Sequence, residues 1–145
     1  VVQLFREKDM LNFKNILYCI DLNSEKISSL ETALEFARLL NCALHIFYVN
    51  DILAGYRHPT DHEDAVALRV KETVDASFLE NVNIIYAVSK GETTEEIVKY
   101  AQDNQIDLII IGHKHRGRLY ASLFDSTDID TIDKVFLPVL VIPEK

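Results

Sequence analysis

The sequence predicts an α/β fold, an open doubly wound parallel sheet of about five strands with helices on both faces. Short apolar runs of strand length alternate along the chain with segments whose apolar residues recur at helical spacing. The runs LIII (108–111) and VLVI (139–142) lack polar and apolar alternation, as is typical of strands buried on both sides. Since 145 residues is close to the commonest domain size, we expect one domain over 1–145, with 1–13 as a candidate N-terminal extension.

Five segments are predicted to be strands, namely 15–21, 43–49, 82–88, 107–112 and 139–142. The first, NILYCID, is apolar until it ends in a carboxylate. The third, VNIIYAV, is rich in β-branched residues, which favour strands. The fourth, DLIIIG, is a nearly continuous apolar run that a glycine ends.

The spacing of apolar residues predicts four helices between these strands. The first covers 24–40, and the second, marked less sharply, covers 61–79. The third covers 93–105, with Thr93 as its N-cap and Glu96 completing a capping box. The fourth precedes the last strand and ends at a proline.

The composition favours a soluble, cytoplasmic protein. The chain has 15 Lys+Arg against 23 Asp+Glu, which is a formal net charge of −8. Nucleic acid and anionic membranes also carry negative charge, so neither is predicted as a partner. The apolar runs are far shorter than the roughly 20 residues of a membrane-spanning helix. Cys19 and Cys42 have no Cys or His at ligand spacing, which predicts reduced, packed thiols.

A ligand site is expected where the strand order of the parallel sheet reverses, outside the carboxyl ends of the strands. The candidates are Asp21 after the first strand, 49–51 after the second and the chain from Gly112 onward after the fourth. The loop HKHRGR (113–118) holds three of the 15 Lys+Arg, and its cations and backbone N–H groups suit a phosphate. The alternative is a solvated basic loop without a ligand.

The sequence shows no catalytic or metal-binding pattern. It contains no G-x-S-x-G, Walker A or G-x-G-x-x-G motif. No general base is placed for phosphate transfer. The set His113, His115 and Asp125 matches no known spacing of metal ligands. We therefore predict no enzyme activity and no metal site, and we interpret His45, which alternates with apolar neighbours, as a core or edge histidine.

Four segments together resemble the universal stress protein family over about residues 14–143. They are NILYCID (15–21), GETTEEIVKYAQDNQIDLIIIGHKHRG (91–117), LFDST (123–127) and VFLPVLVIP (135–143). The resemblance implies the strand order 3-2-1-4-5, a non-enzymatic regulatory role and a homodimer formed through the C-terminal strand. It also implies an adenine-nucleotide site, because some members of the family bind ATP.

The ATP-binding members hold the phosphates on a Gly, two residues, a second Gly, nine residues, and then Gly-Ser or Gly-Thr. Counted from Gly112, this spacing puts His115 and Asp125 at the second and third glycines, followed by Ser126, while Gly117 matches a further glycine of the loop. A carboxylate at Asp125, at the start of a predicted helix, would take the place of a phosphate. We expect weak or absent ATP binding; the alternative is a switch that binds ATP or AMP, with Mg²⁺, at the same site.

The resemblance assigns a set of cofactor-site residues at the carboxyl ends of the strands and in the loop after the fourth strand. The set is Cys19, Asp21, Val49, Ile111, Gly112, His115, Gly117, Ser126 and Thr127. Cys19 and Asp21 would lie near the adenosine, Val49 and Ile111 would line the base, and the glycines and hydroxyls would contact phosphate. For the apolar members the alternative is plain core packing, and for Asp21 it is a helix-entry cap.

Overall fold

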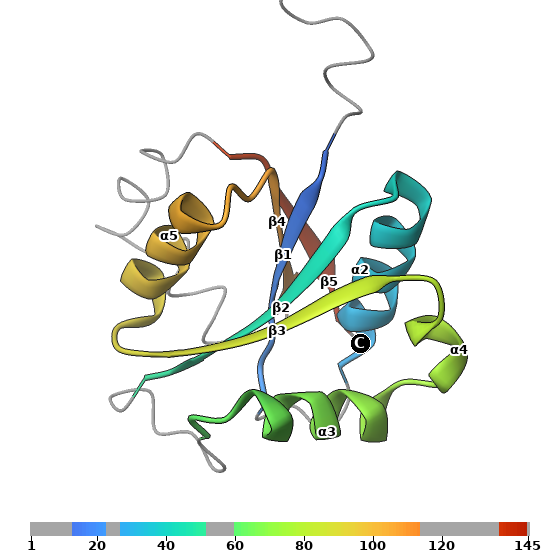
Figure 1. The fold of residues 1–145 in the computed structure, drawn as a ribbon, viewed down its shortest axis with the longest axis horizontal. Coiled ribbons are helices and arrows are strands. Elements are labelled where there is room, and N and C mark those ends of the chain that lie inside the picture. Colours follow the sequence, from blue (N-terminus) through green and yellow to red (C-terminus); the bar gives the residue numbers. More distant parts are fainter. Residues whose placement is uncertain (1–12, 23–26, 52–59, 114–136, 145) are drawn as a thin grey trace, which may run out of the picture.

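The structure, a computed structural model, describes residues 13–22, 27–51, 60–113 and 137–144. It contains a five-stranded, all-parallel sheet in the order β3-β2-β1-β4-β5, with helices on both faces (Figure 1). Both the doubly wound α/β class and the strand order are confirmed. The elements in chain order are β1 (Asn15–Cys19), α2 (Ser28–Leu40), β2 (Ala43–Asn50), α3 (Glu63–Thr73), α4 (Ala76–Leu79), β3 (Asn83–Lys90), α5 (Thr93–Asp103), β4 (Leu108–His113) and β5 (Val139–Pro143).

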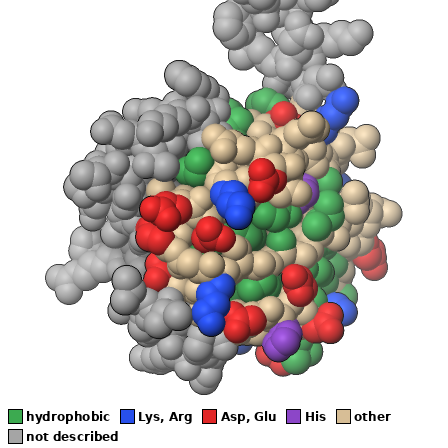
Figure 2. Space-filling model, turned by 60° about the vertical axis from the view of Figure 1, so that its left-hand side comes forward, with side chains coloured by type: hydrophobic (Ala, Val, Ile, Leu, Met, Phe, Trp, Pro, Cys, Tyr) green, Lys and Arg blue, Asp and Glu red, His purple; other side chains and the backbone are tan. Residues whose placement is uncertain are grey.

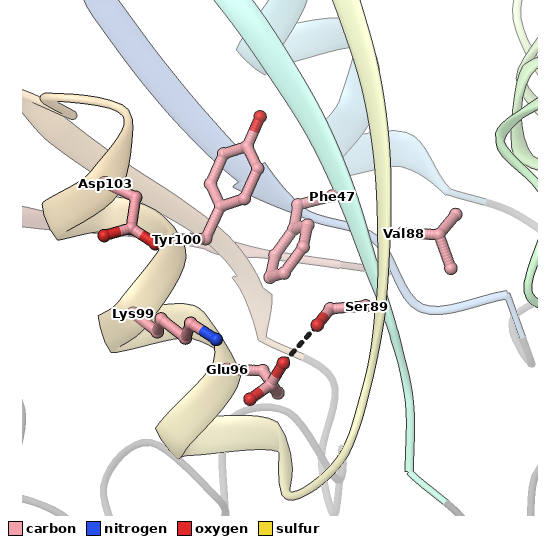
Figure 3. A pocket seen from close by; sticks show the side chains of 7 residues that line it. All are labelled: Phe47, Val88, Ser89, Glu96, Lys99, Tyr100 and Asp103. Atoms are coloured by element: carbon pink, nitrogen blue, oxygen red, sulfur yellow. Dashed lines mark hydrogen bonds between the residues drawn. The ribbon is translucent and has the colours of Figure 1, made fainter.

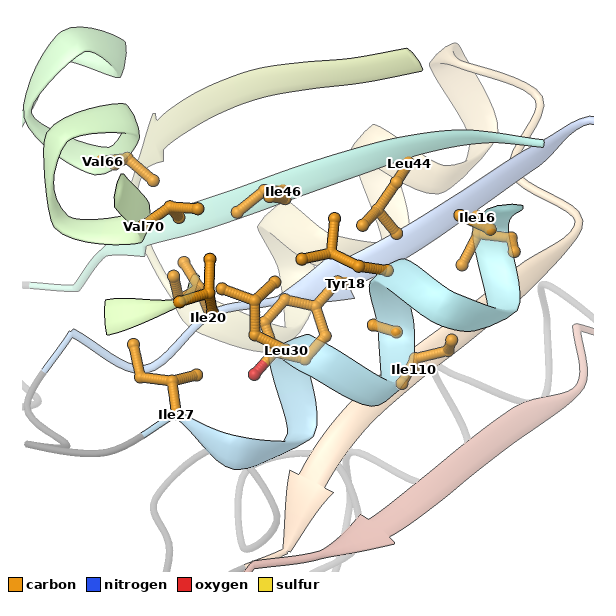
Figure 4. Close-up of a cluster of buried hydrophobic side chains, with 14 of the residues drawn as sticks. Ile16, Tyr18, Ile20, Ile27, Leu30, Leu44, Ile46, Val66, Val70 and Ile110 are labelled. Atoms are coloured by element: carbon orange, nitrogen blue, oxygen red, sulfur yellow. The ribbon is translucent and has the colours of Figure 1, made fainter. Parts of the chain in front are cut away.

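Each face of the sheet carries its own apolar layer, because successive side chains of a strand point to opposite sides. On one face, Tyr18 and Ile110 pack beneath α2 and α3 in the larger cluster (Figure 4). On the other face, Leu17 and Ile109 pack beneath α5. Burial on both sides is why the central strands are apolar at nearly every position.

The boundaries of two predicted helices differ from those observed. The segment 61–79 is not one helix but two, because the backbone at Val74 is extended and Asp75 begins α4 by accepting a hydrogen bond from the Ser77 N–H at 3.0 Å. The first helix begins at Ser28, and the four residues before Ile27 lie outside the described part of the chain. The predicted fourth helix also lies outside it.

The capping box predicted at the start of α5 is wrong by one residue. The N-cap is Glu92, whose carboxylate accepts hydrogen bonds from the N–H groups of Thr94 at 3.1 Å and Glu95 at 2.7 Å. Glu96 instead accepts a hydrogen bond from the Ser89 hydroxyl of β3. A longer acidic side chain thus takes the capping position ahead of the threonine.

Candidate functional site

The strand order reverses between β1 and β4, and three of the predicted site residues lie together at that point. Cys19 is in register with Ile111 of β4, and Val49 lies two residues beyond Phe47, the partner of Cys19 in β2. All three side chains belong to the apolar layer under α5 and are at most 5% exposed. Their observed packing is that of core residues, which form the floor of the carboxyl end of the sheet.

Burial sets the chemistry of the thiol in this floor. Burial raises the pKa of Cys19 to about 12, so the side chain is an un-ionised thiol at neutral pH. A thiolate is the reactive form of cysteine, and among the described residues no cationic group lies beside Cys19 to stabilise one. Cys19 therefore acts as a packing residue of the core and not as a reactive thiol.

Two carboxylates follow the strands β1 and β2 at this edge of the sheet. Asp21 is half-buried, two residues beyond the end of β1. Asp51 comes directly after β2, and one oxygen of its carboxylate accepts hydrogen bonds from Thr93 N–H at 3.1 Å and Thr93 Oγ1 at 2.9 Å. The second carboxylate thereby fastens the start of α5 to the end of β2.

Gly112 faces the opposite side of the sheet from Cys19 and Ile111, toward α2. A Cβ atom at this position would lie 2.5 Å from Ser29 Oγ and 2.8 Å from the carboxyl carbon of Glu144. Neither separation is compatible with ordinary contact, so the close approach of these two residues requires a glycine here.

Ser29 and Glu144 form a hydrogen-bonded group with Tyr18. Glu144 Oε1 accepts from Ser29 N–H at 3.1 Å and from Ser29 Oγ at 2.5 Å. Tyr18 Oη lies 2.6 Å from the same serine oxygen and donates to it, because the serine proton is directed at the carboxylate. Burial raises the pKa of Tyr18 above its ordinary value, which keeps the phenol protonated.

Ser29 and Glu144 were not among the residues predicted from the sequence. The two residues are 115 positions apart, and neither belongs to a local motif. The available signals were a serine inside the helix predicted over 24–40 and an acidic residue just after the last strand. Together they place a carboxylate beside the predicted phosphate-binding glycine.

The remaining predicted residues lie outside the described part of the chain. They are His115, Gly117, Ser126 and Thr127, together with Asp125 and all of the basic loop except the backbone of His113. Within the described ranges, no group of three or more His, Cys, Asp or Glu side chains could hold a metal ion. None of the helices in those ranges is long and apolar enough to cross a membrane.

A hollow of about 190 Å³ lies between α5 and β3, away from the switch point (Figure 3). Figure 2 shows this face, with apolar side chains at the bottom of the hollow and charged side chains around it. Its wall is the Tyr100 ring, which stacks on Phe47 with ring centroids 4.4 Å apart. The residues lining it are Phe47, Val88, Ser89, Glu96, Lys99, Tyr100 and Asp103.

His45 holds that aromatic wall in place. Its Nε2 lies 3.0 Å from Asn15 Oδ1 and its Nδ1 lies 2.7 Å from Tyr100 Oη. Since a carboxamide oxygen only accepts, Nε2 carries the proton and Nδ1 accepts from the tyrosine. His45 is 5% exposed, which confirms the interpretation of a satisfied core histidine.

Comparison with known proteins agrees with this architecture. The chain is similar in fold to a universal stress protein in complex with cAMP, at 16% identity and a TM-score of 0.64, covering 92% of this chain and 99% of that one. Universal stress protein UspA from Lactobacillus plantarum is 23% identical, with a TM-score of 0.63 and coverage of 90% and 98%. A universal stress protein family protein from Arabidopsis thaliana with AMP bound is 14% identical, with a TM-score of 0.58 and coverage of 91% and 92%.

No curated protein matches the chain in sequence. The sequence profile of the Universal stress protein family matches residues 12–143, which is nearly the whole chain. The fold, the strand order and this match together lead to one assignment: the chain belongs to the universal stress protein family.

Proposed function

We propose that this chain is a non-enzymatic regulatory domain that binds ATP weakly or not at all. The observation that carries the proposal is the carboxylate of Glu144, whose carbon lies 2.8 Å from the position of a Cβ on Gly112. By family resemblance, Gly112 opens the phosphate-binding pattern, and that pattern has His115 and Asp125 in place of two glycines. A carboxylate 4 Å from a phosphate opposes its binding by about 4 kcal/mol at an effective dielectric of 20, and by less at longer range or where salt screens the charge.

The side chains at the switch point support the absence of enzyme activity. Nucleophilic catalysis needs an activated nucleophile beside a base. Cys19 is a buried neutral thiol, and the Tyr18 phenol is kept protonated by burial. Ser29 Oγ donates a hydrogen bond to the carboxylate of Glu144, but Ser29 is fully buried in the first turn of α2, so a substrate could not reach it.

A second candidate function is an adenine-nucleotide switch that uses the same site. It is favoured by universal stress protein structures of similar fold that hold cAMP, dAMP or AMP. In this version Val49 and Ile111 line the base, Cys19 and Asp21 lie near the adenosine, and Mg²⁺ accompanies a polyphosphate. Gly112, His115, Gly117, Ser126 and Thr127 form the phosphate side of the proposed site.

We also propose a homodimer formed through β5. The strand is at one edge of the sheet, and its apolar residues Val139–Ile142 are half-buried. An apolar edge strand offers unpaired backbone groups to a second copy of the chain. Light scattering at increasing protein concentration tests the homodimer, since a mass that stays that of one chain would contradict it.

A cytoplasmic location remains a prediction from the composition of the chain.

Calorimetric titration of ATP, ADP and AMP, each with Mg²⁺, separates the two candidate functions. The regulatory-domain proposal expects no saturable heat from ATP in the micromolar range. Saturable micromolar binding would contradict it and support the switch. The double variant His115→Gly, Asp125→Gly restores the glycine pattern, and we expect it to bind ATP more tightly than the parent chain. An unchanged affinity would show that the two side chains do not weaken the site.

A further inference from the structure

Glu144 carries a carboxylate from the end of β5 across β4 to the start of α2. β5 is in register with β4, and Pro143 is the partner of His113. The side chain that follows therefore begins at the carboxyl edge of the sheet. It ends beside Ser29, in the first turn of α2, after passing over Gly112. This is the side of the switch point that faces α2.

The carboxylate is held firmly in that position. Its Oε1 accepts two hydrogen bonds from Ser29, which is fully buried, and Tyr18 supports the serine hydroxyl from below. The N-terminal end of a helix also favours an anion by its dipole. Contacts among residues of β1, α2 and the chain after β5 therefore hold the Glu144 carboxylate beside Ser29.

The negative charge of Glu144 has no cationic partner in the described ranges. All of its hydrogen bonds there are to Ser29, a neutral residue, and it forms no ion pair with a described Lys or Arg side chain. The electric field of a carboxylate extends several ångströms into its surroundings, and less far where salt screens it. Any anionic group that approaches Gly112 meets this field.

We propose that Glu144 sets the charge preference of the switch-point site, so that ligands are disfavoured in proportion to their phosphate charge. This inference rests on the proposed function, because it assumes that an adenosine-type ligand is received at the carboxyl ends of β1 and β4. Adenosine and AMP are then bound in preference to ADP and ATP. Glu144 is a specificity residue in this account and touches no reacting atom.

The test is to measure, by calorimetry on the full chain at low salt, the affinities of four ligands that differ in their number of phosphates: adenosine, AMP, ADP and ATP. Glu144→Gln removes the charge and keeps an oxygen that accepts from Ser29. Glu144→Asp keeps the charge on a shorter arm. Glu35→Gln, on the exposed side of α2, removes the same charge elsewhere and controls for the net charge of the protein. Thermal melting of each variant verifies that it is folded.

We expect Glu144→Gln to raise ATP affinity about tenfold, equivalent to about 1.4 kcal/mol. The gain falls along the series ADP, AMP and adenosine, and is absent for adenosine. Glu35→Gln and Glu144→Asp leave the order of affinities unchanged. Raising the salt concentration reduces the difference between parent and Glu144→Gln, because salt screens the charge.

Other outcomes overturn the inference in distinguishable ways. An equal gain for adenosine and ATP, or no gain at all, shows that Glu144 does not act by charge and leaves the proposed function standing. If no probe binds to the parent or to Glu144→Gln, the charge of Glu144 is not what excludes nucleotides, and the inference fails alone. If the parent binds ATP as tightly as adenosine at micromolar concentration, both the inference and the proposed function fail.

Discussion

Replacing Gly112 with alanine tests whether this glycine is required by packing. The new methyl group would lie 2.5 Å from Ser29 Oγ and 2.8 Å from the carboxyl carbon of Glu144, so both must move. Ser29 is buried in the first turn of a helix and has little freedom to retreat. Overpacking costs about 1–3 kcal/mol, and a weakened hydrogen bond to a carboxylate adds to it. We expect the free energy of unfolding to fall by about 2 to 4 kcal/mol.

The assay is urea unfolding of the parent, Gly112→Ala, Ser29→Ala and the double variant. Removing the serine hydroxyl takes away the nearest atom in the conflict, so alanine at 112 should then cost at least about 1 kcal/mol less. Unchanged slopes of the unfolding transitions would show that the comparison concerns stability. A cost of Gly112→Ala below about 0.5 kcal/mol, or an equal cost with and without the serine, would refute the packing argument.

Three further predictions concern other parts of the chain. Burial lowers the pKa of His45, so as pH falls this imidazole is protonated in the unfolded chain before it is protonated in the folded one. The free energy of unfolding should therefore fall as pH drops below about 6.5, and should fall less in His45→Gln. Midpoints of urea unfolding from pH 8 to 5 measure both. Cys19, with its pKa raised to about 12, should resist a thiol reagent at pH 8 in a Cys42→Ser background until urea unfolds the chain; rapid native labelling would contradict its burial. Glu92→Ala should destabilise the protein by about 1 kcal/mol, because it removes the cap of α5, whereas Thr93→Ser, which keeps a hydroxyl, should cost less.

The fold was predictable because the signals that define it are local and strong. Continuous apolar runs mark the strands β1 and β4, which are buried on both faces, and a similar run marks β5, which lies at the sheet edge and is half-buried. Boundaries were less predictable where two acceptable residues compete for one position. Glu92 and Thr93 are both able to cap α5; in the structure Glu92 accepts the hydrogen bonds of the first turn, while Thr93 hydrogen-bonds to Asp51.

The candidate site was predictable only in part. Asp21, Val49 and Gly112 are placed by the ends of strands, which the sequence marks clearly. Ser29 and Glu144 meet only because β5 lies beside β4 and α2 covers the same face, an arrangement that no local pattern encodes. The break between α3 and α4 was likewise not predictable from a local pattern, since at Val74 the backbone is extended and the side chain packs into the core.

The most direct test of the central claim is to identify what small molecules accompany the purified protein. The chain is expressed, purified without added nucleotide, denatured, and the released fraction is analysed by mass spectrometry and quantified against protein. Because the proposed function has the carboxylates of Asp125 and Glu144 opposing a polyphosphate, we predict far less than one ATP per chain, on the order of one per hundred or fewer. Stoichiometric ATP, released only on denaturation, would contradict the account.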